Sequence, residues 1–171
     1  MNHLVALLLR MFVMLFAYGL AALAASAFLH LVAWPLMREG LEEAPWALVG
    51  GIGLSIPLIG LFVAYFGFLP AVVAIGISEA FAFRSWLYYA LSGAAGGIFA
   101  LIIAYGASIA MIGAAEDIAR NDKDIPLGER TETALAVVGG GIVAGLVYWA
   151  IAGRNARRWL PEASAPAPSG S

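Results

Sequence analysis

The sequence predicts an all-α polytopic membrane protein, in which four transmembrane helices form an antiparallel bundle with short connections. This prediction rests on four long uncharged stretches, at 11–34, 46–68, 86–114 and 133–153. Each reaches the ~20 apolar residues that a helix needs to cross a hydrocarbon core about 30 Å thick. The composition agrees, because 63% of the residues are hydrophobic and only 12% are charged, about half the charged fraction of a soluble domain.

The first span, 11–34, follows a weakly basic N-terminal segment and ends at Trp34. Ala25-Ser26-Ala27 has the small-x-small pattern of a signal-peptide cleavage site. The apolar run nevertheless continues through Leu31 to Trp34, which is longer than the apolar region of a signal peptide. We therefore expect a retained spanning helix, with a cleaved signal peptide as the alternative.

The second span, 46–68, belongs to a charge-free region that is too long for one upright helix and too short for two. Pro57 can lie inside a membrane helix as a kink, whereas Pro70 follows the Gly67-Phe68-Leu69 turn and is typical of a helix start. A short helix at 70–83 would then lie at the membrane interface. One continuous, strongly tilted helix over 46–83 is the alternative.

The third and fourth spans, 86–114 and 133–153, carry small residues at four-residue spacing. Membrane helices associate through close van der Waals contact, which small side chains permit. Gly93 and Gly97 form one GxxxG pair, and Gly141 and Gly145 form another. We expect these four glycines to mark helix-packing positions. Similar small ridges occur at Ala17, Ala21 and Ala25 in the first span and at Ala136, Gly140 and Ala144 in the fourth.

The domain organisation is one transmembrane domain at 1–160, followed by a tail at 161–171 rich in Pro, Ala, Ser and Gly, which is typical of disorder. Four spans place both termini on the same side of the membrane. Arg154, Arg157 and Arg158 crowd the end of the last span, and positive residues next to a span favour the cytoplasmic side. We therefore expect both termini in the cytoplasm.

Glu79 is the polar residue that most invites a functional hypothesis. It is the first acid after a long uncharged stretch, and it precedes Arg84 by five residues. An acid near hydrocarbon often serves as a proton relay or as a counter-charge for a substrate. The structural alternative is that Glu79 lies at the interface, facing headgroups or paired with Arg84, although five-residue spacing is poor for a pair on one helix face.

His30, near the end of the first span, is a further candidate polar residue. Its nearest histidine in the sequence, His3, lies toward the opposite face of the membrane, so we expect no metal site. The chain has no cysteine, which excludes disulfides and thiolate ligands. No catalytic or phosphate-binding motif is present, and the formal net charge of −2 argues against a nucleic-acid partner. We expect no cofactor and no enzymatic activity.

Three segments resemble uncharacterised small four-span inner-membrane proteins of alphaproteobacteria. These segments are 69–81, 84–93 and 148–154, which include Arg84-Ser85-Trp86-Leu87-Tyr88-Tyr89 and Tyr148-Trp149-Ala150. The resemblance covers about a sixth of the chain. It implies a bacterial inner-membrane location and no particular activity.

Two functional hypotheses follow. The first is a structural or accessory component of a membrane assembly, in contact with the bilayer and with a second copy or another membrane protein. The second is a small transporter or channel subunit that uses Glu79 as a proton or cation site. The small multidrug transporters also have four spans, but they need a glutamate inside the first helix, which this chain lacks.

Overall fold

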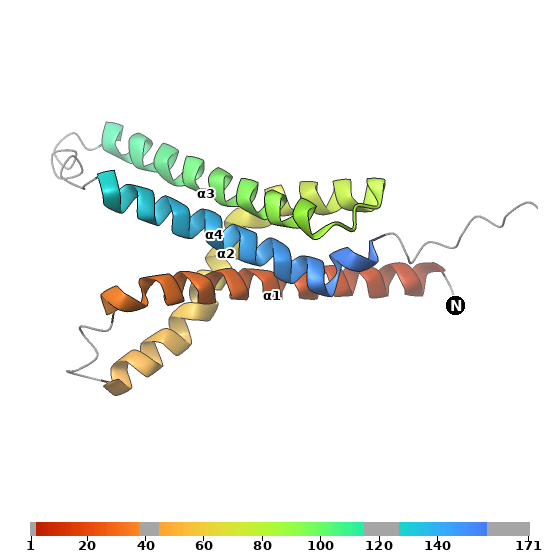
Figure 1. The fold of residues 1–171 in the computed structure, drawn as a ribbon, viewed down its shortest axis with the longest axis horizontal. Helices are drawn as coiled ribbons and strands as arrows, with labels where there is room; N and C mark the ends of the chain where they lie inside the picture. The colour runs from red at the N-terminus through yellow and green to blue at the C-terminus, as the bar shows by residue number, and fades with distance from the viewer. Residues whose placement is uncertain (1–2, 38–44, 115–126, 157–171) are drawn as a thin grey trace, which may run out of the picture.

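The computed structural model describes residues 3–37, 45–114 and 127–156, and these residues are helical apart from short turns (Figure 1). The elements in chain order are α1 (His3–Met37), α2 (Pro45–Phe81), α3 (Trp86–Ala114), α4 (Leu127–Ile151) and a short 3₁₀ helix, η3 (Gly153–Asn155). All four α-helices are long and apolar enough to cross a membrane. The predictions of an all-α fold and of four apolar membrane helices are confirmed.

The helices extend beyond several of the predicted spans. α1 begins at His3 rather than at 11, and α4 begins at Leu127 rather than at 133. Polar residues at the start of α4, such as Glu129 and Glu132, can belong to a helix that continues past the hydrocarbon into water. The predicted tail at 161–171 lies outside the described residues.

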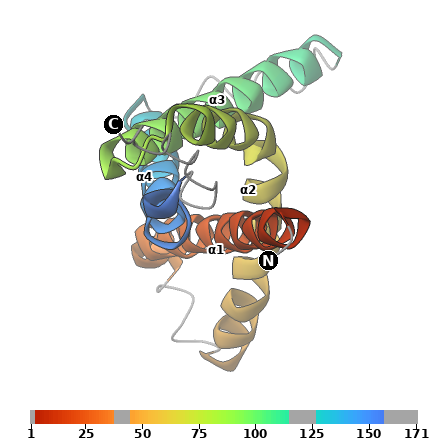
Figure 2. The same cartoon turned by 90° about the vertical axis from the view of Figure 1, so that its right-hand side faces the viewer.

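The helices form a ring around the centre of the molecule. α4 packs against α1 on one side and α3 on the other, and α2 contacts both α1 and α3 (Figure 2). α4 runs antiparallel to α1 and to α3, whereas α2 crosses α1 obliquely (Figure 1). The regular antiparallel bundle of the sequence prediction is therefore not confirmed, because one of its four helices departs from the common axis.

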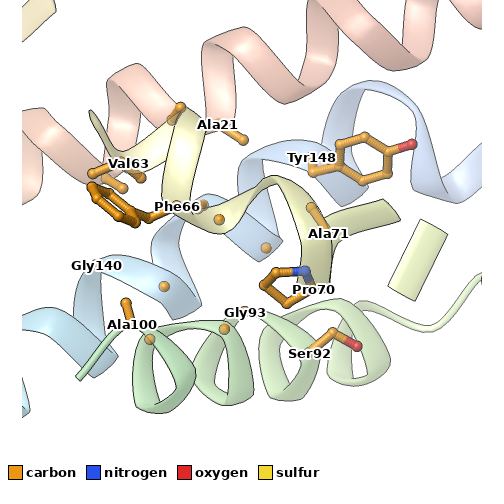
Figure 3. Close-up of a pocket in the computed structure, with 18 of the residues that line it drawn as sticks. Ala21, Val63, Phe66, Pro70, Ala71, Ser92, Gly93, Ala100, Gly140 and Tyr148 are labelled. Carbon is orange, nitrogen blue, oxygen red and sulfur yellow. The ribbon is translucent and has the colours of Figure 1, made fainter. Parts of the chain in front are cut away.

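The interfacial helix predicted at 70–83 is not confirmed either, because α2 continues through Gly67 and Pro70 to Phe81. Proline at position 70 cannot donate a backbone hydrogen bond to the carbonyl four residues earlier, so it bends a helix without necessarily ending it. The ribbon of α2 changes direction close to Pro70 (Figure 3). One bent helix therefore replaces the predicted span and separate short helix.

α2 ends in a tight turn before α3. Ala82 has a φ of 54°, in the left-handed region, and the Phe83 N–H donates to the Ser78 carbonyl over 3.0 Å. This six-residue closure is the Schellman arrangement, whose left-handed position is usually glycine. The turn satisfies a terminal carbonyl of α2 and directs the chain into α3.

The closest helix contact joins α3 to α4 through the four glycines of the GxxxG pairs. A Cβ atom on Gly93 would overlap the Gly141 carbonyl oxygen, and one on Gly141 would overlap that of Gly93. At Gly97, a Cβ atom would lie 2.9 Å from the Val137 carbonyl oxygen. Gly145 packs in the same way against the Tyr89 backbone. Any side chain at this crossing would push the two backbones apart.

The contact between α1 and α4 uses a second small-residue face. Ala17, Ala21 and Ala25 are each at most 3% exposed, and Gly140 of α4 faces the backbone of Ala25. The outward faces are apolar and open, with Leu4 74% and Leu54 76% exposed. Apolar surface of this kind is expected where lipid rather than protein covers the helices.

Candidate functional site

The polar centre of the described helices is an ion pair between Arg10 of α1 and Glu79 of α2. Arg10 Nη2 donates to Glu79 Oε1, and the two side chains are only 9% and 18% exposed. Removing two charges from water is costly, and the attraction between them offsets that cost only when both are well bonded. The pair joins residues that are 69 positions apart, so it ties the first turns of α1 to the end of α2.

The Arg10 guanidinium also bonds the end of α4. Nη1 and Nη2 each lie 3.2 Å from the Ala152 carbonyl oxygen, directly after the last residue of the helix. The last carbonyls of a helix lack partners within the helix and carry partial negative charge, so a cation here is favourable. One arginine thus holds three helices together: its own, α2 and α4.

A cluster of tyrosines packs beside this pair. The rings of Tyr89 and Tyr148 have their centroids 5.6 Å apart, and they form a core with Ala17, Ala21 and Ala152. Tyr148 is 5% exposed. Its hydroxyl, like Arg10 Nε, is buried without a hydrogen-bond partner in the described part of the chain. Such a group is an exception among buried polar atoms, and it requires an explanation.

Arg84 has a different role from the one considered in the sequence analysis, where it was the possible partner of Glu79. Its Nε donates to the Ala156 carbonyl over 3.1 Å, and its own carbonyl accepts from Trp149 Nε1 over 2.8 Å. These contacts join the α2–α3 turn to the end of α4. Glu79 forms its ion pair with Arg10, a residue whose role no local sequence pattern indicates.

His30 lies in a separate polar contact between α1 and α2. Its Nδ1 is 2.8 Å from the Ser26 carbonyl oxygen and its Nε2 is 2.7 Å from Ser55 Oγ. A carbonyl only accepts, so Nδ1 carries a proton in this contact. The Ser55 hydroxyl also lies 3.3 Å from the Ile52 carbonyl oxygen. Ser26 Oγ donates across the same interface to the Ile56 carbonyl over 2.7 Å. This arrangement is typical of interhelical hydrogen bonding in membranes.

A cavity of about 420 Å³ lies inside the ring of helices, and all four helices line it (Figure 3). Its walls are mostly apolar and include the small residues of α1, α3 and α4 together with Val63, Phe66 and Pro70 of α2. α2 contributes lining residues on both sides of Pro70, from Phe62 to Ile75. Its lining offers few groups that could solvate an ion.

The arrangement contains no recognisable catalytic or metal chemistry within the described residues. No group of three or more His, Asp or Glu side chains comes together there as metal ligands. The fold and the polar contacts define a class, namely an α-helical membrane protein with four candidate spans. A scan against protein-family models and searches of curated proteins and of solved structures found no match to this chain.

Proposed function

We propose that this chain is a non-enzymatic integral protein of a bacterial inner membrane, with both termini in the cytoplasm, that acts as a structural or accessory component of a membrane assembly. The observation that carries the proposal is the contact of Arg10 with Glu79 and Ala152. Glu79 would otherwise be the first candidate for transport chemistry, but its charge is paired with that of Arg10 in a contact that holds α1, α2 and α4 together. These polar residues thus have a structural role in the proposal.

The first half of α2 supports an accessory role. It diverges from α3 and α4 (Figures 1 and 2) and contacts α1 through Ser55 and Ile56. Its Leu54 and Leu58 are 76% and 56% exposed. A Cβ atom on Gly53 would meet nothing within 4 Å. Small residues allow a neighbouring membrane helix to approach closely. We therefore propose that a second copy or another membrane protein packs on this half of α2.

Purification in native-lipid polymer particles tests the proposal. We expect the wild-type chain to be recovered as an oligomer or with a constant partner, and Gly53→Leu to lower that recovery. Gly19→Leu is the matched control, because Gly19 also faces open space but lies on α1. Repeated recovery of a monomer alone would refute the accessory role. Equal recovery for both variants would show that the partner does not pack on this face of α2.

The second candidate function is a small transporter or channel subunit in which Glu79 takes up a proton or cation. The burial of an ionisable pair within membrane helices favours it, because such pairs often mark transport pathways. The apolar lining of the cavity opposes it. In proteoliposomes, a Glu79-dependent transporter should lose flux in Glu79→Gln but retain part of it in Arg10→Gln, which breaks the same ion pair and keeps the carboxylate. Flux unaffected by Glu79→Gln would exclude Glu79 from transport.

A further inference from the structure

The central cavity has a length, a lining and a volume that together suit one kind of ligand. On α1 its lining extends from Tyr18 to Leu29, and on α4 from Val137 to Tyr148. At 1.5 Å per residue, each stretch is roughly 16 Å long. The hydrocarbon core of a bilayer is about 30 Å thick. The cavity therefore extends over about one leaflet.

The two ends of the cavity lie at different depths in the fold. Tyr148 and Ser92 lie at one end of the cavity, and Val63 and Phe66 lie toward the opposite end (Figure 3). Tyr148 is three residues before the end of α4 at Ile151, so its end of the cavity is close to the depth at which the hydrocarbon of a bilayer meets the headgroups. The Tyr148 hydroxyl points away from the other lining residues and is buried, so it does not face the cavity.

Neither water nor an ion suits this space. A water molecule needs two to four polar partners, and cavities with apolar walls stay dry but accept apolar molecules. Pockets of about 300–1,000 Å³ with apolar walls and a few polar groups are typical of small-molecule sites. The surrounding medium is hydrocarbon, and the cavity is partly open to it. A hydrocarbon chain matches both the apolar walls and the length of the cavity.

We propose that the cavity binds one fatty acyl chain of a membrane phospholipid, with the ester end of the chain on the side of Ser92 and Tyr148. The chain fills the apolar space between the four helices. The bound lipid completes the interior of the fold.

A photoreactive lipid tests the proposal in the full-length protein. The probe is a phosphatidylethanolamine with a diazirine midway along one acyl chain, reconstituted with the protein in vesicles and crosslinked by light. Mass spectrometry then maps the labelled residues. We expect labels on inward positions such as Ala21 and Ala144, which line the cavity. Labels confined to outward positions such as Leu61 and Leu91, which are 66% and 62% exposed, would overturn the proposal.

A cavity-filling variant and a matched control sharpen the test. Gly96 lines the cavity and has no atom within 4 Å of an added Cβ, whereas Gly106 has equally open space but does not line it. We expect Gly96→Leu to abolish most of the inward labelling and Gly106→Leu to leave it unchanged. Ala100→Leu, at another lining position, replaces Gly96→Leu if that variant does not fold. Equal inward labelling in wild type and in the folded filling variant would refute the site.

Competition with unlabelled lipids tests the identity of the ligand. We expect unlabelled phospholipid to displace the probe from the inward positions. Displacement of the probe by an isoprenoid quinone, but not by unlabelled phospholipid, would overturn the assignment of an acyl chain.

Discussion

Arg10 contributes to stability through the three helices that its guanidinium connects. The free energy of a buried ion pair depends strongly on both partners being present, since removal of one leaves a buried, uncompensated charge. In this chain the same cation also bonds the Ala152 carbonyl. The loss of Arg10 would therefore leave the Glu79 carboxylate without this counter-charge and the end of α4 without the hydrogen bonds to its Ala152 carbonyl.

We expect Arg10→Met and Glu79→Leu, taken singly, each to lower the free energy of unfolding by about 3–5 kcal/mol. The double variant should recover much of that loss, because it removes both charges and leaves apolar groups of similar volume. Unfolding in mixed micelles, followed by circular dichroism during titration with a denaturing detergent, measures the three values. Strictly additive losses in the double variant would show that the two side chains do not stabilise each other.

Ala82 gives a second prediction at the scale of one residue. Its φ of 54° disfavours any side chain with a Cβ atom, and glycine is the usual residue at this position of a Schellman turn. We expect Ala82→Gly to raise the free energy of unfolding by up to about 1 kcal/mol, after allowance for the greater freedom of glycine in the unfolded chain.

The control for Ala82→Gly is Ala95→Gly, at an exposed position within α3, where glycine should cost about 0.5–1 kcal/mol. The same detergent titration measures both variants. A loss of stability in Ala82→Gly comparable to that in Ala95→Gly would contradict the left-handed conformation at residue 82.

At the scale of elements, the pairing of α3 with α4 depends on glycines at positions where the two backbones touch. We expect Gly93→Ala and Gly141→Ala each to destabilise the protein by about 1–3 kcal/mol, as overpacking does in a close-packed interior. Gly106→Ala, which adds its methyl group to open space, should not be destabilised. Thermal unfolding in one detergent compares the three variants, and equal behaviour would show that the helices do not cross at these glycines.

α2 shows why the path of an element is harder to predict than its existence. The stretch from 46 to 83 allowed either a break near Pro70 or one long helix. Proline is compatible with both, because it removes a single backbone bond and fixes its own φ. In the structure, neighbouring helices contact α2 on both sides of Pro70. The Tyr18 hydroxyl donates to the Ala64 carbonyl, and the Tyr88 hydroxyl donates to the Ala74 carbonyl.

At the scale of the whole molecule, the arrangement in the membrane can be tested directly, because the chain has no native cysteine. We expect Asn2→Cys and Asn155→Cys to resist a membrane-impermeant maleimide in intact cells and to react after permeabilisation. Gly40→Cys and Asp122→Cys should react in intact cells, since four spans place these positions on the opposite side. Labelling that separates the two termini would contradict four spans.

The four apolar helices could be predicted from the sequence because membrane insertion is a local property. Each stretch must satisfy its own backbone hydrogen bonds in hydrocarbon, so length and composition suffice. The small residues of the GxxxG pairs could be recognised for a similar reason, because their spacing places them on one face of a single helix.

The partner of Glu79, the path of α2 and the central cavity depended on tertiary structure. Arg10 is 69 positions from Glu79, and no local pattern relates two residues at that separation. The cavity is lined by residues of all four helices, so no single stretch of sequence defines it. Each membrane helix is thus determined by its own residues and the surrounding bilayer. Polar contacts between helices, and the cavity among them, arise only when helices that are distant in the sequence pack together.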